Sequence, residues 1–260
     1  MCRWAAWSGT PRHLEDLICN PVHSLIRQSR HAQACLTPVN GDGFGMARYG
    51  ARPEPCLCKD IRPDWSDPNL SQLAHHTRAG LFMAHIRAST GTDTTHANCH
   101  PFSHARWSFM RNGQIGGYER IRKGIDGLIP DTLYHGRTGA TDSEALFLIA
   151  LGLGLDRDPI SAMRAAVGVP EDLSHDRGAL PHMRFATCWS DGARLFAARY
   201  ASDDAAPSMF YRATPDGALI VSEPLDAAPD LWTPVEAGRV IVIENGAVAN
   251  APFDRARAAA

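Results

Sequence analysis

The sequence has little excess of either charge and no long apolar segment. Its 260 residues include 26 Lys and Arg against 28 Asp and Glu, for a formal net charge of −2, and the basic residues are scattered. We therefore expect no nucleic-acid-binding face and no basic membrane-binding surface. The most apolar run, Phe147 to Leu155, is far shorter than the ~20 residues that a membrane-spanning helix needs. The sequence thus predicts neither a nucleic acid nor a membrane as a partner.

A secretory signal is also missing, because no N-terminal stretch combines a charged start, a long apolar run and a small-residue cleavage site. We therefore predict a cytoplasmic location. The cysteine count of seven is odd, which without a signal predicts thiols rather than disulfide bridges. An apolar content of 44% with 21% charged residues is ordinary for a globular protein, and we predict one domain over residues 1–260.

Common metal-binding spacings are absent, since the sequence contains no CxxC or HExxH pattern. A zinc site remains an alternative because three histidines recur at four-residue spacing and cysteines lie near them. These residues are His96, His100, His104, Cys99, Cys56 and Cys58. Pro101 interrupts any helix that would align the histidines. We therefore expect no metal and no cofactor.

Cys2 is the first candidate catalytic residue in the sequence. It follows Met1 and has a small side chain, so removal of Met1 is expected and would leave a thiol and a free α-amine on Cys2. An α-amine titrates at about pH 7.7–8.0 and can accept the thiol proton, so one residue would supply both nucleophile and base. The alternative is that Cys2 is a small residue near a frayed end.

The first third of the chain gives mixed structural signals. Residues 2–8 read as a strand, and residues 13–36 as a loop with a short helix. Three glycines within residues 40–45 predict a turn with unusual backbone angles, and they match no phosphate-binding pattern. Asp67, followed by Pro in the first turn, predicts the start of a helix that ends at Gly80.

Two apolar runs predict buried strands that deliver polar groups at their ends. Residues 81–86 lead to Arg87, and residues 107–110 lead to Arg111, Asn112 and Gly113. The planar fork of Arg87 suits a substrate carboxylate, although it could instead pair with a nearby acid. The Asn112 amide and the Gly113 N–H could bind an oxyanion. The alternative for this Asn-Gly pair is a hairpin turn.

A capping box marks the start of a central helix. Thr141 is the expected cap and Glu144 its reciprocal partner, with a helix running to about Leu153. Asp142, in the first turn, could accept a hydrogen bond from a substrate ammonium. Alternatively, it only interacts favourably with the helix dipole.

The C-terminal part, about residues 184–250, changes to short β-rich runs separated by Asp-Gly and Asn-Gly turns. This pattern predicts an antiparallel meander. The predicted strands are Phe185 to Trp189, Leu195 to Tyr200, Met209 to Arg212, Leu219 to Val221 and Val240 to Ile243. The Ala-rich tail is expected to be dispensable.

Taken together, five motifs in this order resemble the class II glutamine amidotransferases, which are N-terminal-nucleophile hydrolases. The motifs are Met1-Cys2-Arg3, Ala84 to Thr90, Asn98 to Phe102, Asn112-Gly113-Gln114 and Thr141 to Glu144. The chain is most similar to stand-alone members, in particular the amidotransferase subunit of the cytosolic glutathione-degradation complex. That similarity rests on residues 40–45, 65–70 and 222–225.

The resemblance implies an α+β fold, a four-layer αββα sandwich of two antiparallel sheets. It also implies that Cys2 is the nucleophile, that Asn112 and Gly113 form the oxyanion hole, and that Arg87 and Asp142 hold the α-carboxylate and α-ammonium of the substrate. Thr90 would add a polar contact near Arg87. Relatives usually carry His where this chain has Arg111, which leaves the leaving-group preference open.

The implied activity is hydrolysis of the γ-glutamyl amide bond of glutamine or of a γ-glutamyl peptide, with glutathione as a candidate. A peptidase-like or synthase partner subunit is expected. One alternative is a glutaminase that delivers ammonia to a separate synthase. Another, of a different class, is an inactive binding module.

Overall fold

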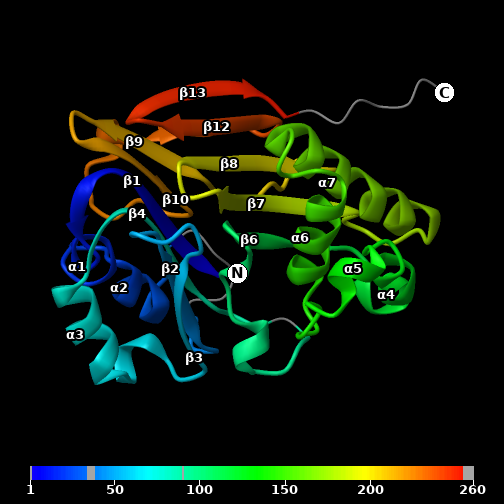
Figure 1. Ribbon diagram of the computed structural model, residues 1–260, viewed down its shortest axis with the longest axis horizontal. Helices are drawn as coiled ribbons and strands as arrows, with labels where there is room; N and C mark the ends of the chain where they lie inside the picture. The colour runs from blue at the N-terminus through cyan, green and yellow to red at the C-terminus, as the bar shows by residue number, and fades with distance from the viewer. Residues whose placement is uncertain (1, 34–38, 90, 254–260) are drawn as a thin grey trace.

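Within the residues that the computed structural model describes, 2–33, 39–89 and 91–253, the strands form two antiparallel sheets (Figure 1). The larger sheet has the spatial order β11 (Thr233–Pro234), β9 (Phe210–Thr214), β10 (Gly217–Val221), β1 (Arg3–His13), β4 (Arg78–Ile86), β2 (Phe44–Arg48) and β3 (Cys56–Asp60). The smaller has the order β13 (Ala247–Pro252), β12 (Arg239–Glu244), β8 (Arg194–Ala201), β7 (Met183–Ser190), β6 (Trp107–Ile115) and β5 (Phe102–His104).

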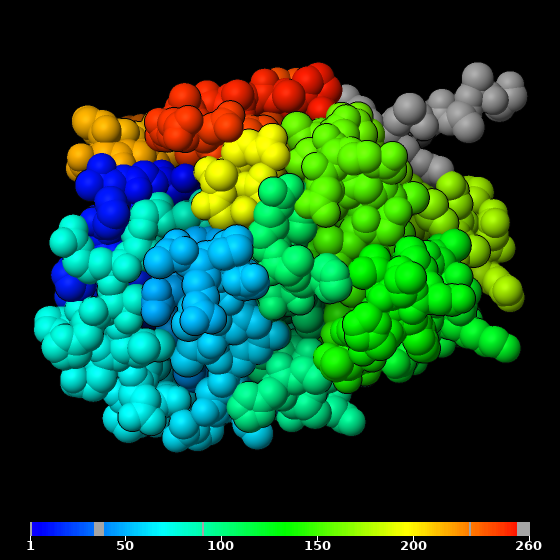
Figure 2. All heavy atoms as spheres, in the orientation of Figure 1, coloured from blue at the N-terminus to red at the C-terminus, as the bar shows by residue number. Residues whose placement is uncertain are grey.

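Helices cover the outer face of each sheet. The larger sheet is covered by α1 (Glu15–Ile18), α2 (Leu25–Arg30) and α3 (Pro68–His76). The smaller is covered by α4 (Tyr118–Asp126), α5 (Asp131–Tyr134), α6 (Asp142–Gly152) and α7 (Pro159–Asp176). Short 3-10 helices are η1 (Asp64–Ser66), η2 (His96–Asn98) and η3 (Pro229–Leu231). Figure 2, in the same view, shows the N-terminal part (blue to cyan) and the helices α4–α7 (green) on opposite sides of the molecule.

The core lies in three layers, which follow from the alternation of side chains along each strand. On β1, Ala5 and Trp7 pack against α1–α3, whereas Trp4 and Ala6 face the other sheet. On β6, Phe109 packs against the helices of the smaller sheet. A third cluster fills the space between the two sheets. The predicted four-layer αββα sandwich is therefore confirmed.

Several local predictions need correction. The helix capped by Asp67 ends at His76, and Gly80 lies inside β4, where a Cβ would approach the Gly9 carbonyl oxygen to 2.9 Å. The C-terminal strands do form antiparallel hairpins, but they do not form one meander. β9, β10 and β11 join the larger sheet, while β7, β8, β12 and β13 join the smaller one.

Two other expectations are met in part. Residues 13–36 contain α1 and α2 rather than a single short helix. The cysteines in the described part of the chain are free thiols, while Cys35 and the Ala-rich tail lie outside the described residues. No helix in the described part is both long and apolar enough to cross a bilayer.

Candidate active site

Cys2 lies at the edge of the space between the two sheets. It directly precedes β1, and its position in the alternation matches Trp4 and Ala6, which face the smaller sheet. Its Sγ accepts a hydrogen bond from the backbone N–H of Ala88 at 3.3 Å and lies 3.5 Å from the Ala88 carbonyl oxygen. Burial raises the pKa of the Cys2 thiol, while the Ala88 N–H and the charge of Arg87 oppose this shift. The thiol therefore needs a nearby base to ionise at neutral pH.

Asn112 connects the two sheets at the nucleophile. Its Nδ2 donates to the carbonyl oxygen of Cys2 at 2.7 Å, and its Oδ1 is buried without a hydrogen-bond partner in the described structure. A side-chain amide has two N–H groups. One therefore holds the backbone of Cys2, and the second is available to an oxygen atom near Sγ.

Asn112 and Gly113 lie inside β6, opposite Ala186 and Phe185 of β7. The hairpin alternative is therefore wrong, and so is the expectation that the pair follows the end of a strand. Gly113 has φ 129°, and a Cβ there would come within 1.9 Å of the Arg184 carbonyl oxygen. Only glycine fits this position, because both the backbone angle and the neighbouring strand exclude a side chain.

Arg87 follows β4 and is 3% exposed. Its Nη2 donates to the Oγ of Ser89 at 3.0 Å, to the Oγ1 and carbonyl oxygen of Thr92 at 2.8 and 3.2 Å, and to the carbonyl oxygen of Asp93 at 3.1 Å. None of the ion pairs between described residues involves Arg87. Its charge is thus solvated by neutral oxygens, and it can accept an external carboxylate.

Asp142 is the first residue of α6. The expected cap is confirmed, because Thr141 Oγ1 accepts from the N–H of Glu144 at 3.2 Å. The reciprocal half of the capping box is not formed. Glu144 instead accepts from Arg137 Nη1 at 2.6 Å and from the N–H of Gly139 at 2.8 Å. Its carboxylate therefore anchors the loop before the helix.

Among the described residues, the closer partners of the Asp142 carboxylate contact one of its two oxygens, Oδ2. Its Oδ2 accepts from the N–H of Ile115 at 3.0 Å and lies 3.0 Å from Arg111 Nη1. Its Oδ1 receives, within the described part of the chain, only a 3.3 Å hydrogen bond from Ser143 Oγ. The side chain of Asp142 is 18% exposed, so Oδ1 is the atom to which a ligand could bind.

The structure thus brings four of the predicted site residues close to one another. Cys2 and Asn112 are in direct contact, Arg87 precedes the residue that contacts Sγ, and Asp142 binds the backbone two residues after Gly113. Thr90 lies outside the described residues. The backbone contribution of Ala88 was not predicted, because no side-chain pattern signals it.

Two further supports of the site were missed in the sequence. Asp42, within the glycine-rich turn, accepts from the N–H of Ser89 at 2.7 Å and so fixes the segment after Arg87. Glu223 forms a buried ion pair with Arg3 at 3.3 Å. Both residues lie in segments on which the resemblance to the family rests, residues 40–45 and 222–225, and that was the available signal.

Within the described residues, no three His, Cys, Asp or Glu side chains gather as metal ligands would. His85 and His100 are both buried and stack with ring centroids 4.2 Å apart. Burial lowers the pKa of His85 to about 3 and the pKa of His100 well below its ordinary value, so both are neutral at physiological pH.

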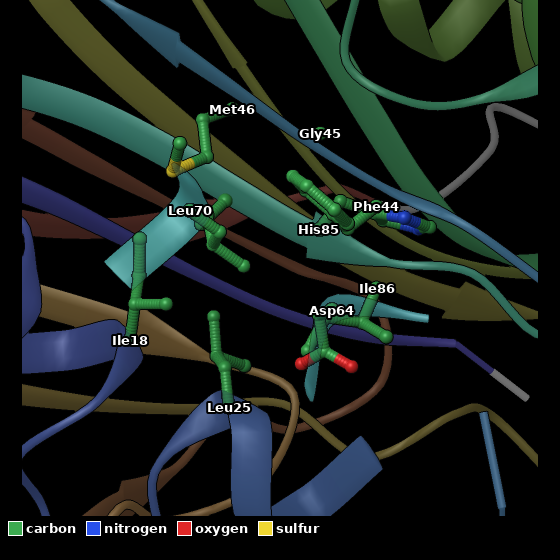
Figure 3. Close-up of a pocket in the computed structure, with 10 residues that line it drawn as sticks. Ile18, Leu25, Phe44, Gly45, Met46, Asp64, Leu70, His85 and Ile86 are labelled. Atoms are coloured by element: carbon green, nitrogen blue, oxygen red, sulfur yellow. The ribbon is translucent and has the colours of Figure 1, made fainter. Parts of the chain in front are cut away.

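A small cavity of about 10 Å³ lies between β2, β4 and the helices on the outer face of the larger sheet. Its lining includes Ile18, Leu25, Leu70 and Asp64, and the Asp64 carboxylate points among the apolar side chains (Figure 3). Burial raises the pKa of Asp64 to about 7. Neither Cys2 nor Asn112 lines this cavity, so it is distinct from the candidate active site.

Comparisons with known proteins agree with this geometry. The family described as glutamine amidotransferases class-II matches residues 17–215. The probable glutamine amidotransferase DUG3 of Saccharomyces cerevisiae is 40% identical over 160 residues, which cover 58% of this chain and 45% of the yeast protein. The chain therefore matches less than half of that relative's length. The γ-glutamyl-hercynylcysteine sulfoxide hydrolase of Mycolicibacterium smegmatis is 26% identical over 97% of this chain and 100% of that protein.

Solved structures show the same architecture. A glutamine aminotransferase class-II domain protein from Silicibacter pomeroyi has a TM-score of 0.78 and 43% identity, covering 97% of this chain and 99% of that one. The glutamine phosphoribosylpyrophosphate amidotransferase of Bacillus subtilis has a TM-score of 0.66 at 12% identity, covering 98% of this chain and 49% of that one. The second likeness concerns the fold alone.

Proposed function

This chain belongs to the class II glutamine amidotransferases, and from that premise we propose that it hydrolyses a γ-glutamyl amide through a thioester on Cys2. The contact between Asn112 Nδ2 and the Cys2 carbonyl oxygen at 2.7 Å carries the proposal. It joins an oxyanion donor to the nucleophile, although the two residues are far apart in sequence. If the two sheets only packed against each other here, a buried side-chain amide at this position would have no structural reason.

In the proposed reaction, removal of Met1 frees the α-amine of Cys2, which takes the proton from Sγ. The thiolate attacks the γ-carbonyl carbon, and the oxyanion is held by the second Nδ2 proton of Asn112 and by the N–H of Gly113. The amine then delivers its proton to the leaving nitrogen as the C–N bond breaks. Water, deprotonated by the same amine, hydrolyses the thioester and releases the glutamyl product.

The same proposal assigns binding of the glutamyl group to the two charged residues. Arg87, which has no carboxylate partner in the described structure, would pair with the α-carboxylate. Asp142 would accept the α-ammonium through its Oδ1, and Thr90 would add a polar contact near Arg87. Opposite charges at the two ends of the site orient an amino acid and leave the side-chain carbonyl at Cys2.

For the leaving group, we propose a γ-glutamyl peptide, with glutathione as the candidate. The mycobacterial hydrolase supports this choice, since it is named for a γ-glutamyl compound. A peptidase-like partner subunit and a cytoplasmic location belong to the same proposal, as does one domain over residues 1–260. The alternative is a glutaminase serving a separate synthase. Its substrate has the same glutamyl group and differs only in the leaving group.

The test combines intact-protein mass spectrometry with the glutamine-like electrophile 6-diazo-5-oxo-L-norleucine. We expect a mass without Met1 and one label on Cys2, with no label on Cys2→Ala. Cys19→Ser is the matched control and should label as the wild type does, because burial together with Glu15 and Asp64 raises the pKa of Cys19 to about 11. An unlabelled protein that keeps Met1 would contradict the proposal and favour the inactive binding module.

Assays on glutamine and on glutathione then identify the leaving group. Each assay measures the release of glutamate, so the two substrates are compared through the same product. Preferential hydrolysis of glutathione supports the peptide assignment. Hydrolysis of glutamine alone would contradict it and support the glutaminase alternative.

A further inference from the structure

Arg111 lies beside Asn112 on β6, but its side chain leaves the opposite face of the sheet. Alternation along the strand sends Asn112 towards Cys2 and Arg111 towards α6. The Arg111 side chain is fully buried. It therefore does not narrow the space around Sγ, and its influence on the site must pass through the residues that it contacts.

The main contact of Arg111 is Asp142, with Nη1 3.0 Å from Oδ2. The other contacts are longer, namely 3.4 Å from Nη1 to Ser143 Oγ and 3.4 Å from Nη2 to the Arg184 carbonyl oxygen. The guanidinium carbon also lies 5.9 Å from the centre of the Phe185 ring. Among the ion pairs of the described residues, Asp142 and Arg111 pair only with each other.

This pairing changes what Asp142 can offer a substrate. An isolated carboxylate would bind an ammonium as an ion pair, but here the negative charge is already balanced by a buried cation. The N–H of Ile115 and the N-terminus of α6 add further positive potential. Oδ1 remains as a hydrogen-bond acceptor, but the net charge of the Asp142–Arg111 pair is close to zero.

We propose that Arg111 makes the amine end of the site nearly neutral, so that the enzyme accepts acyl donors without a positively charged α-amine. The substrate class is γ-glutamyl-type amides whose α-nitrogen is absent or acylated, in addition to those with a free ammonium. Arg87 is not neutralised in this way, so a carboxylate at the other end remains required. The inference rests on the proposed function, because it assumes that Asp142 faces the α-nitrogen.

The experiment compares kcat/KM for L-glutamine with kcat/KM for glutaramate, the same amide without the α-amino group. Both reactions consume water and release ammonia, so one assay serves both. Losing a hydrogen bond to a charged, unneutralised group typically lowers affinity by about 10- to 100-fold. We expect the wild-type ratio of glutamine to glutaramate to be below about tenfold.

The Arg111→Met variant tests whether Arg111 is the cause of the low glutamine-to-glutaramate ratio. Removing the cation restores the charge of Asp142, so the ratio should rise at least about fivefold, through a lower KM for glutamine. Arg194→Met is the control, because Arg194 also pairs with an aspartate, Asp191, at 2.8 Å, but at the β7–β8 turn and with a partly exposed side chain. Its ratio should equal that of the wild type.

A wild-type ratio of about tenfold or more overturns the inference, and this measurement needs no variant to fold. A rise of less than about fivefold in Arg111→Met, or a fall, also overturns it and makes Arg111 a residue that only holds Asp142 in place. A protein that hydrolyses neither amide and carries no label on Cys2 refutes the proposed function itself, and the inference with it.

Discussion

Replacing Asp64 by Asn should change the stability of the protein in a pH-dependent way. Asp64 is 2% exposed and lies among the apolar side chains that line the small cavity. Burial raises its pKa from 3.8 to about 7. Hydrogen bonds from the Ser29 side chain and the Trp65 backbone N–H, together with the charge of Arg30, oppose this rise in pKa, and Asp64 in turn raises the pKa of Cys19.

The direction in which stability changes with pH depends on whether the folded or the unfolded state keeps Asp64 protonated. Between pH 3.8 and about 7, the folded protein keeps Asp64 protonated while the unfolded chain has it ionised. The stability that protonation provides is therefore complete below pH 3.8 and is lost as the pH rises towards 7. Each pH unit in this window changes the free energy of unfolding by about 1.4 kcal/mol. Between about pH 5 and pH 8 the loss is about 2.5 kcal/mol.

Urea unfolding of the wild type and of Asp64→Asn at about pH 5 and pH 8 measures this effect. Since asparagine does not titrate, the stability of the variant relative to the wild type should increase by about 2.5 kcal/mol over that interval. Asp158→Asn is the control. The pKa of Asp158 is lowered by hydrogen bonds from Ser161, so the effect of that change should be constant over the same range. An Asp64→Asn effect that does not vary with pH would refute the reasoning.

Three further substitutions have separate expected outcomes. Asn112→Ala should lower kcat by about 100- to 1000-fold in steady-state assays, because an oxyanion donor is removed; a kcat within about threefold of the wild type would show that the amide only holds Cys2 in place. Gly113→Ala should lower the urea midpoint sharply, since its Cβ would overlap the Arg184 carbonyl oxygen, and an unchanged midpoint would contradict the close approach. Thr141→Ala should cost about 1 kcal/mol of unfolding free energy, because the N–H of Glu144 loses its cap, whereas Thr141→Ser should retain most of it.

The sequence predicted elements best where local signals and burial agree. The run at 81–86 is apolar throughout and lies in a strand between two others. The helix caps at Asp67 and Thr141 depend on residues within three positions of the cap, and both caps form. The class of fold and the identity of the site residues came from the resemblance of motifs, since no periodicity indicates which sheet a strand joins.

The errors occur where a distant segment decides the local structure. Asn112 and Gly113 have the composition of a hairpin turn, but pairing with β7 keeps them in a strand. Gly80 has the composition of a helix end, yet β4 has already begun because β1 pairs with it. The pairing of Arg111 with Asp142 was not predicted for the same reason. It depends on which face of β6 meets α6.

Cys2 illustrates how far tertiary structure can overrule a local expectation. A residue so near the beginning of the printed sequence is expected to fray, but β1 lies between β10 and β4 in the sheet. Trp4 is fully buried, and its backbone N–H donates to Ser222 Oγ at 3.0 Å. Arg3 is held by Glu223 on one face, and the Cys2 carbonyl by Asn112 on the other. Moving Sγ away from Ala88 would require breaking contacts with both sheets. We therefore infer that the geometry around Cys2 persists as long as the two sheets remain packed together.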